Sequence, residues 1–320
     1  MTNILAADIG GTNSRFAHFT AGQDWGLSLI KSKWLKTKGS ASFGHLIKEL
    51  GKSDFSLLPG QADIAVIAVA GPVERNVYSS PPFITWDIDI SNAEKDFGFK
   101  RCLLINDFVA QAFACRSPVG RAAKKILPGE NVSDAASAVI GAGTALGKAA
   151  LMPDGSGGFT AIPSEGGHAN FPFVSKEEFE FQEFLRRELK EDYVIANFVV
   201  SGRGLSYIHQ FLTGEKIEPD EVTASLSADS ETLIWASRFY GRVCRNYALE
   251  ILALGGVFIA GGVAARAPVL LEHKAFMEEF RSSGTMSAIL GKIPVFLITD
   301  QESGLWGAAY LGLQTLKQNK

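Results

Sequence analysis

Short apolar runs alternate along the chain with segments whose apolar positions follow a helical period. The apolar runs at residues 4–7, 62–70 and 102–105 predict buried strands. The run at 62–70 consists almost entirely of β-branched and small apolar side chains, which is typical of a central strand covered on both faces. Further strands are expected at residues 27–35 and 294–299. Helical spacing predicts helices at residues 42–50, 108–115, 175–189, 202–211, 231–254 and 304–316. Because strands and helices follow one another in turn, the pattern predicts an α/β protein.

Local signals refine this assignment at two helix starts and one connection. Ser91 precedes Glu94 by three residues, and Ser175 precedes Glu178 in the same way, which is typical of a capping box. Residues 117–136 contain two prolines and two glycines and are expected to form a loop or linker. The side chains expected on the inner face of the helix after Ser175 are Phe179, Phe184 and Leu185.

A glycine–threonine turn between two predicted strands occurs near the start of the chain and again in its middle. Residues 10–12 are Gly-Gly-Thr, and residues 15–19 then alternate between apolar and polar side chains. Residues 138–151 repeat the plan, with Gly-Ala-Gly-Thr at 141–144 between two apolar segments. Neither turn matches the phosphate loop that ends in Gly-Lys-Ser/Thr, and neither leads from a strand into a helix as a dinucleotide fingerprint does. Both turns therefore predict hairpins.

These hairpins carry groups that can bind a phosphorylated ligand. Glycines let backbone N–H groups approach an anion, Thr12 and Asn13 add side-chain donors, and Asp8 supplies a carboxylate able to hold a hydrated Mg²⁺. Alternatively, each turn is an ordinary hairpin whose glycines only supply a positive φ. Because the plan occurs twice, we expect two related halves that hold a polyphosphate between them.

Three further segments concentrate polar or glycine residues next to predicted strands. Asn106 and Asp107 follow a buried strand, at the end where open α/β sheets bind ligands, although Asp107 can equally cap the next helix. Glu165 and His168 flank two glycines and can reach one ligand, or else belong to a surface turn. Residues 255–263 predict a strand followed by a Gly-Gly turn, which suits an adenine ring or is simply a tight corner.

Composition narrows the class of protein. The 320 residues suffice for two domains, 46% of them are apolar, and a net charge of −3 argues against a nucleic-acid or membrane-surface partner. Cys102, Cys115 and Cys244 are too few and too far apart for a disulfide framework or a zinc site, so we expect them to be reduced and buried. With no leader pattern before the first strand and no uncharged run long enough to span a bilayer, a cytoplasmic protein is expected.

Five segments resemble, in order, the motifs of the bacterial glucokinases, the ATP-dependent group without a cysteine-rich zinc motif. They are residues 5–15 (Leu-Ala-Ala-Asp-Ile-Gly-Gly-Thr-Asn-Ser-Arg), 105–108 (Ile-Asn-Asp-Phe), 141–147 (Gly-Ala-Gly-Thr-Ala-Leu-Gly), 165–168 (Glu-Gly-Gly-His) and 255–262 (Gly-Gly-Val-Phe-Ile-Ala-Gly-Gly). The resemblance implies an actin-like ATPase fold, related to ribonuclease H, with two α/β domains around a cleft. It also implies a small domain at residues 1–116, joined by a C-terminal helix at 304–320, a large domain at 117–303, and a homodimer.

The resemblance further implies a role for each motif residue. The implied reaction is the ATP-dependent phosphorylation of glucose at its 6-hydroxyl, as in glycolysis, with Asp107 as the catalytic base. The implied sugar contacts are Asn106, Asp107, Glu165, His168 and Asn197. The implied nucleotide contacts are Asp8, Gly10, Gly11, Thr12, Asn13, Gly143, Thr144, Gly261 and Gly262, with Asp8 holding Mg²⁺ through water. Because Asn197 stands where family members carry a glutamate, another hexose or an N-acyl hexosamine stays open as substrate, as does a sugar-sensing protein without activity.

Overall fold

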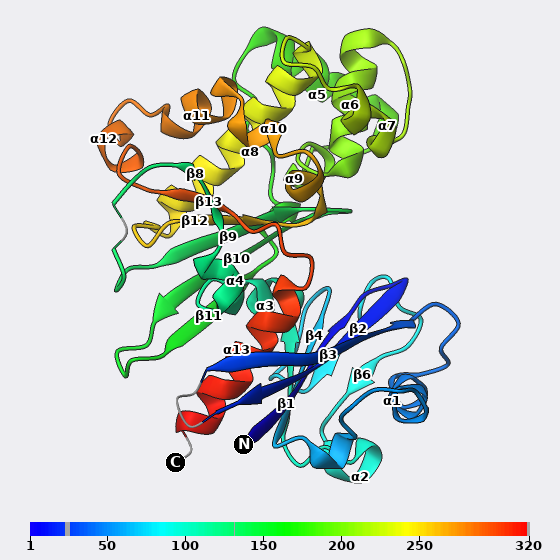
Figure 1. Ribbon diagram of the computed structural model, residues 1–320. Coiled ribbons are helices and arrows are strands. Elements are labelled where there is room, and N and C mark those ends of the chain that lie inside the picture. The colour runs from blue at the N-terminus through cyan, green and yellow to red at the C-terminus, as the bar shows by residue number, and fades with distance from the viewer. Residues whose placement is uncertain (23–25, 131, 319–320) are drawn as a thin grey trace. The chain divides into compact units, whose positions relative to one another are not determined.

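The computed structural model describes residues 1–22, 26–130 and 132–318, which cluster into two compact units. Unit 1 comprises Met1–Ala122 and Glu302–Lys320, and unit 2 comprises Ala123–Gln301 (Figure 1). Each unit has its own β-sheet and its own helices. The α/β class predicted from the hydrophobic pattern is therefore confirmed.

A mixed five-stranded sheet in the order β3-β2-β1-β4-β7 forms the centre of unit 1. Its strands are β1 (Thr2–Ile9), β2 (Asn13–Ala21), β3 (Leu27–Lys36), β4 (Ile64–Val69) and β7 (Cys102–Asn106), and the short strands β5 (Tyr78–Ser79) and β6 (Ile88–Asp89) pair separately. The helices are α1 (Phe43–Lys52), η1 (Pro59–Gln61), α2 (Ala93–Phe97), α3 (Asp107–Ala114), α4 (Pro118–Arg121) and α13 (Ser303–Gln318). Because β1, β4 and β7 run parallel, their carboxyl ends lie at one edge of the sheet.

Helices cover both faces of this sheet, which explains why β4 and the middle of β1 are apolar (Figure 1). On one face lies α13, where a Cβ atom on Gly307 would collide with the backbone of Ala110 and one on Gly312 would lie 3.1 Å from Ile4. These glycines permit the close approach of α13 to α3 and to β1. On the other face, Phe43 of α1 joins an apolar cluster with the alternate residues of β1.

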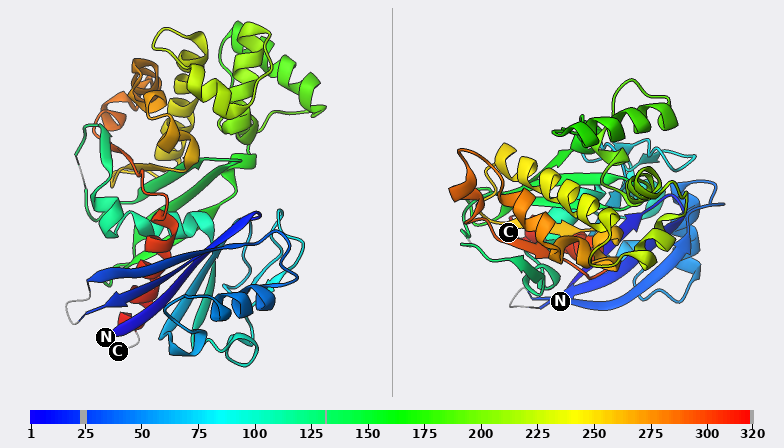
Figure 2. Two further views of the ribbon diagram at one scale, coloured as in Figure 1. Left: turned by 45° about the vertical axis from the view of Figure 1, so that its right-hand side comes forward. Right: turned by 90° about the horizontal axis from the view of Figure 1, so that it is seen from above.

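Unit 2 is built on a six-stranded sheet in the order β11-β10-β9-β12-β13-β8. The strands are β8 (Lys124–Leu127), β9 (Ser137–Ala142), β10 (Leu146–Pro153), β11 (Phe159–Ser164), β12 (Val257–Ala260) and β13 (Val295–Leu297). The helices are η2 (Gly166–His168), α5 (Lys176–Leu189), η3 (Ala196–Phe198), α6 (Gly202–Thr213), α7 (Pro219–Ser225), α8 (Glu231–Glu250), α9 (Gly262–Arg266), α10 (Val269–Glu272), α11 (Lys274–Arg281) and α12 (Ser287–Leu290). Figure 2 shows most of these helices gathered over one face of the sheet.

Helix α8 lies at the centre of this helical layer and connects it by both apolar and ionic contacts. The ring of Phe239 stacks on Phe181 of α5 at a centroid distance of 5.9 Å. Three residues later, the buried guanidinium of Arg242 pairs with Glu178 of α5 at 2.5 Å and with Glu279 of α11 at 2.8 Å. These bonds join α5, α8 and α11. Breaking them would be strongly destabilising, because it would leave an uncompensated charge in the interior.

Two sequence predictions about local structure are wrong. Helix α2 has Asn92, not Ser91, as its N-cap, because the backbone N–H of Ser91 donates to Asp89 Oδ1 at 2.8 Å and places Ser91 in the preceding turn. The expected linker at residues 117–136 contains α4 and the edge strand β8, which pairs with β13. Two exposed lysines begin β8, so the strand lacks the apolar run that would have revealed it.

The inner face of α5 also differs from the expectation. Phe179 is 50% exposed, whereas Phe181 and Leu185 are buried and Phe184 is half-buried. The buried face of the helix instead begins at Glu178, because its carboxylate is neutralised by Arg242. Apolar spacing alone does not reveal a buried face that starts with a charged residue.

The three cysteines are free, as expected. Cys115 and Cys244 are buried, while Cys102 is partly exposed. Burial raises the pKa of the Cys102 and Cys115 thiols to about 12, so both thiols stay protonated at neutral pH. In the described ranges, no helix combines the length and the apolarity that crossing a membrane requires.

Candidate functional site

In unit 1, the predicted residues gather at the carboxyl ends of the parallel strands. Asp8 is the penultimate residue of β1 and lies opposite Arg15 of β2 in the antiparallel register. Desolvation raises the pKa of the Asp8 carboxyl, and the charge of Arg15 partly offsets this effect. A Cβ atom on Gly304, in the first turn of α13, would lie 3.8 Å from Asp8 Oδ2, so the helix start reaches this carboxylate.

The first glycine–threonine turn connects β1 to β2 as the hairpin prediction requires. The backbone N–H of Gly10 donates to the carbonyl of Asn13 at 3.1 Å. Gly11 has no room for a side chain, because its Cβ would lie 2.8 Å from the carbonyl oxygen of Phe83. The side chains of Thr12 and Asn13 are exposed, so both are accessible to a ligand.

Asn106 and Asp107 lie where β7 ends and α3 begins, and their roles there differ. Asn106 Oδ1 accepts the backbone N–H groups of Phe108 at 2.8 Å and Val109 at 3.3 Å, so Asn106 is the N-cap of α3. Its Nδ2 donates to the carbonyl of Gly71 at 3.0 Å. Asp107 is the first residue of the helix, partly exposed, and its Oδ1 accepts from the N–H of Phe108 at 3.0 Å. The main capping function thus belongs to Asn106.

In unit 2, the second glycine–threonine turn joins β9 to β10 and contacts the start of α6. The backbone N–H of Gly143 donates to the carbonyl of Ala145 at 2.8 Å, and its carbonyl accepts from the N–H of Gly202 at 2.9 Å. Ser201 caps α6 by accepting from Gly204 at 3.1 Å. No atom lies within 4 Å of a Cβ placed on Gly143, and Thr144 is exposed. The turn is therefore open toward a ligand.

Gly261 and Gly262 follow β12 and lie at the same end of the sheet. The φ of Gly261 is +96°, and its Cβ would lie 2.8 Å from the carbonyl oxygen of Ala142, so only glycine fits there. Gly262 is the first residue of α9, so the expected Gly-Gly turn leads directly into a helix. Because β9 and β12 are parallel neighbours, the phosphate and adenosine motifs predicted from the sequence are brought together.

The predicted sugar residues of unit 2 converge on one turn. Asn197 Nδ2 lies 3.2 Å from His168 Nε2, and the Glu165 carboxylate lies 4.0 Å from the same nitrogen. Asn197 Oδ1 accepts the backbone N–H of Leu146 at 2.8 Å, which ties the cluster to the start of β10. A Cβ on Gly167 would collide with both the Leu146 carbonyl and Asn197 Oδ1, so glycine permits this close approach. The side chains of Glu165 and His168 are more than half exposed and accessible to a ligand.

Two residues at these sites were not singled out by sequence reasoning. Gly202 supports the second glycine–threonine turn, and its signal is the Ser-Gly-Arg-Gly segment at the start of α6. Lys148, in the strand after the turn, is buried beside the turn at residues 165–168, and its signal is a charge within an apolar run. In the described parts of the chain, no three His, Cys, Asp or Glu side chains are close enough together to hold a metal by themselves.

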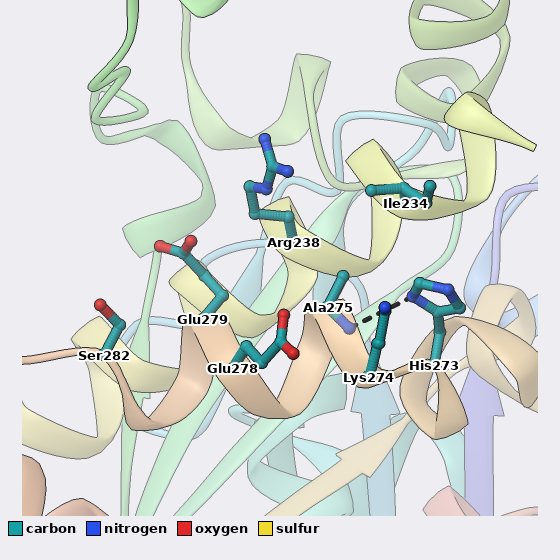
Figure 3. Close-up of a pocket in the computed structure, with 8 residues that line it drawn as sticks. All are labelled: Ile234, Arg238, His273, Lys274, Ala275, Glu278, Glu279 and Ser282. Carbon is teal, nitrogen blue, oxygen red and sulfur yellow. Dashed lines mark hydrogen bonds between the residues drawn. The ribbon is translucent and has the colours of Figure 1, made fainter.

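A pocket of about 340 Å³ lies elsewhere in unit 2, between α8 and α11 (Figure 3). It is lined by Ile234, Arg238, His273, Lys274, Ala275, Glu278, Glu279 and Ser282. Its charges are of both signs, and Glu279 is already paired with Arg242 and Arg245. None of the predicted site residues lines this pocket.

The fold, together with similar solved structures, defines a sugar kinase of the actin-like ATPase fold. The crystal structure of a glucokinase from an Antarctic psychrotroph matches with a TM-score of 0.83 and 28% identity, over 98% of this chain and 99% of that one. The glucokinase family model matches residues 5–315, so the chain belongs to the glucokinase family. It is a glucokinase-type hexose kinase, and the resemblance identified from the five motifs is confirmed.

Individual relatives agree with this assignment over nearly their full length. The glucokinase of Tolumonas auensis is 33% identical over 322 residues, which cover 96% of each protein. The glucokinase of Pseudomonas paraeruginosa is 30% identical over 329 residues, covering 98% of this chain and 93% of the relative.

Proposed function

We propose that the protein transfers the γ-phosphoryl group of ATP to the 6-hydroxyl of glucose. The observation that carries the proposal is the convergence of Glu165, His168 and Asn197 on one turn, although His168 and Asn197 are 29 positions apart. A sugar presents several hydroxyl groups, and carboxylate, imidazole and amide side chains supply the acceptors and donors that pair with them. A site of this kind rejects analogues that leave its polar groups unpaired.

Asp107 is the proposed catalytic base. Its carboxylate accepts the proton of the sugar hydroxyl while the hydroxyl oxygen attacks the γ-phosphorus, and ADP leaves with the electron pair of the broken P–O bond. The positive end of the α3 dipole stabilises the carboxylate charge before this transfer. Asn106 positions Asp107, because its cap bonds and its bond to Gly71 hold the junction between β7 and α3.

The glycine–threonine turns and the Gly261-Gly262 segment are the proposed nucleotide contacts. The open backbone at Gly143 and the exposed hydroxyls of Thr12 and Thr144 suit phosphate oxygens. Asp8 fits Mg²⁺, because this ion keeps several waters and needs only one or two protein carboxylates in addition to phosphates. When bound, Mg²⁺ neutralises phosphate charge during transfer.

ADP release coupled to a dehydrogenase, measured across a panel of hexoses, tests this function. We expect turnover with glucose, and we expect Asp107→Asn to leave glucose binding nearly intact while kcat falls by ~10²–10⁴-fold. Equal background with every sugar would instead support a sugar-sensing protein. Selective turnover of mannose or an N-acyl hexosamine would retain the mechanism but replace glucose as substrate. This outcome would be attributed to the neutral Asn197 beside His168, because family members carry a glutamate at that position.

The glucokinase resemblance also supports a homodimer that acts in the cytoplasm on the ATP available there. Analytical ultracentrifugation of the purified chain tests the dimer. A single species with the mass of one 34.4 kDa chain at micromolar concentration would contradict it.

A further inference from the structure

Lys148 occupies a position where the fold favours an apolar side chain. It follows Leu146 by two residues in β10, so its side chain points to the same face of the sheet as that core residue. Among the described residues it is the one buried lysine, with 6% of its surface exposed. Lysines are almost never buried unless they are paired, so this position is costly.

No described residue fully offsets the desolvation of the buried Lys148 ammonium group. The ammonium group makes no ion pair or hydrogen bond with a described residue, and its Nζ lies 5.2 Å from the ring centroid of Tyr247 in α8. Desolvation lowers the pKa of Lys148, while Glu250 and Cys244, also in α8, act in the opposite direction. A buried charge that contributes nothing evident to stability is the kind of departure from folding preferences that is expected at functional sites.

The side chain of Lys148 ends directly behind the sugar-binding turn. A Cβ placed on Gly166 would lie 3.2 Å from Lys148 Cδ and 3.4 Å from Lys148 Nζ, so glycine at 166 leaves the room that the lysine fills. In the sheet register, Lys148 is the partner of Ser164, whose Oγ accepts the N–H of Gly166 at 3.1 Å. Glu165 lies between these two residues, and His168 is in the same turn.

We propose that Lys148 is a positioning residue for the sugar-binding turn Glu165–His168. Its stem packs behind Gly166 and supports the turn, and its ammonium group places a positive charge directly behind the segment that carries Glu165 and His168. It contacts neither the sugar nor the nucleotide. The inference rests on the proposed function, because it assigns Lys148 to the affinity for the sugar rather than to phosphoryl transfer.

Two substitutions at Lys148 and one control test this assignment in the full-length protein. Lys148→Met keeps the length of the side chain but removes the charge, and we expect the KM for glucose to rise about tenfold while kcat and the KM for ATP stay unchanged. The same variant should melt at an equal or higher temperature, because it removes a buried charge. Lys148→Arg, which keeps the charge, should recover most of the affinity.

The matched control is Lys125→Met. Lys125 also lies over an aromatic ring, at 6.0 Å from the centroid of Phe296, but it is exposed on β8 at the opposite edge of the same sheet. We expect its KM for glucose to equal that of the unmodified protein.

Each result decides between positioning and a merely structural role. An unchanged KM in Lys148→Met would overturn the inference, and so would a raised KM that comes with a lower melting temperature and no recovery in Lys148→Arg. Calorimetric glucose affinity separates this test from that of the proposed function. A protein that binds glucose without phosphorylating it refutes the kinase proposal, while a weaker affinity in Lys148→Met would still support the positioning role.

Discussion

Replacing Gly167 by alanine tests how tightly the proposed sugar-binding turn is built. The added Cβ would collide with the carbonyl oxygen of Leu146 and with Oδ1 of Asn197. These residues are also joined by a 2.8 Å hydrogen bond from the backbone N–H of Leu146 to Asn197 Oδ1. Neither group can retreat without disturbing that bond, so the turn or the asparagine must move.

The expected magnitude follows from two contributions. Inserting a methyl group into a packed position costs about 1–3 kcal/mol. Losing the hydrogen bond between Leu146 and Asn197 costs about 0.5–1.5 kcal/mol more. We therefore expect Gly167→Ala to destabilise the protein by about 1.5–4.5 kcal/mol. If about 1.4 kcal/mol of this appears as misplacement of Asn197 and His168, the KM for glucose rises tenfold.

Urea unfolding followed by circular dichroism and the coupled ADP assay measure these two effects. Gly284→Ala is the matched control, because Gly284 also belongs to unit 2 and no atom lies within 4 Å of its Cβ position. We expect the control to leave both the urea midpoint and the KM unchanged. A Gly167→Ala protein that matches the control in both measurements would refute the close approach of the turn to Asn197.

Three further substitutions give separate expectations. Asp107→Asn should abolish most turnover while calorimetry shows unchanged glucose binding, and near-normal kcat would remove Asp107 from the proton transfer. Arg242→Met should lower the free energy of unfolding by about 3–5 kcal/mol in urea titrations, because Glu178 is left buried without its partner. Combining Arg242→Met with Glu178→Gln should recover part of this loss, and no recovery would contradict the explanation. Burial raises the pKa of Asp8, so the folded state retains its proton longer than the unfolded chain and stability falls as pH rises from the ordinary pKa of 3.8 to the raised one. Asp8→Asn should remove this slope and raise the melting temperature at neutral pH without nucleotide, as measured by differential scanning fluorimetry, and an unchanged pH profile would argue against the raised pKa.

Local chemistry in the sequence was sufficient to predict the central strands, the longer helices and both hairpins, but not β8 or the short helices such as α4. Apolar runs predict buried strands because β1 and β4 are covered on both faces, and the glycine–threonine turns predict hairpins because glycine relieves local backbone constraints. The Ser175 cap is confirmed for the same reason, since a cap depends on residues within one turn of a helix. The family could likewise be identified from the order of five short motifs.

Side-chain partners that are distant in the sequence could not be predicted. The exposure of Phe179 and the burial of Glu178 depend on Arg242, which lies 64 positions after Glu178. The division of roles between Asn106 and Asp107 depends on Gly71, because that carbonyl accepts the Asn106 amide and orients it for capping.

The sequence by itself thus determined where the central strands and the longer helices form and which side chains are chemically able to act. Only the tertiary structure decided that Asn197 reaches His168 and Leu146, and that Lys148 ends behind Gly166. The physical reason is that strand and helix formation depend on neighbours a few residues away, whereas a polar cluster depends on distances between segments that the chain brings together only when it folds.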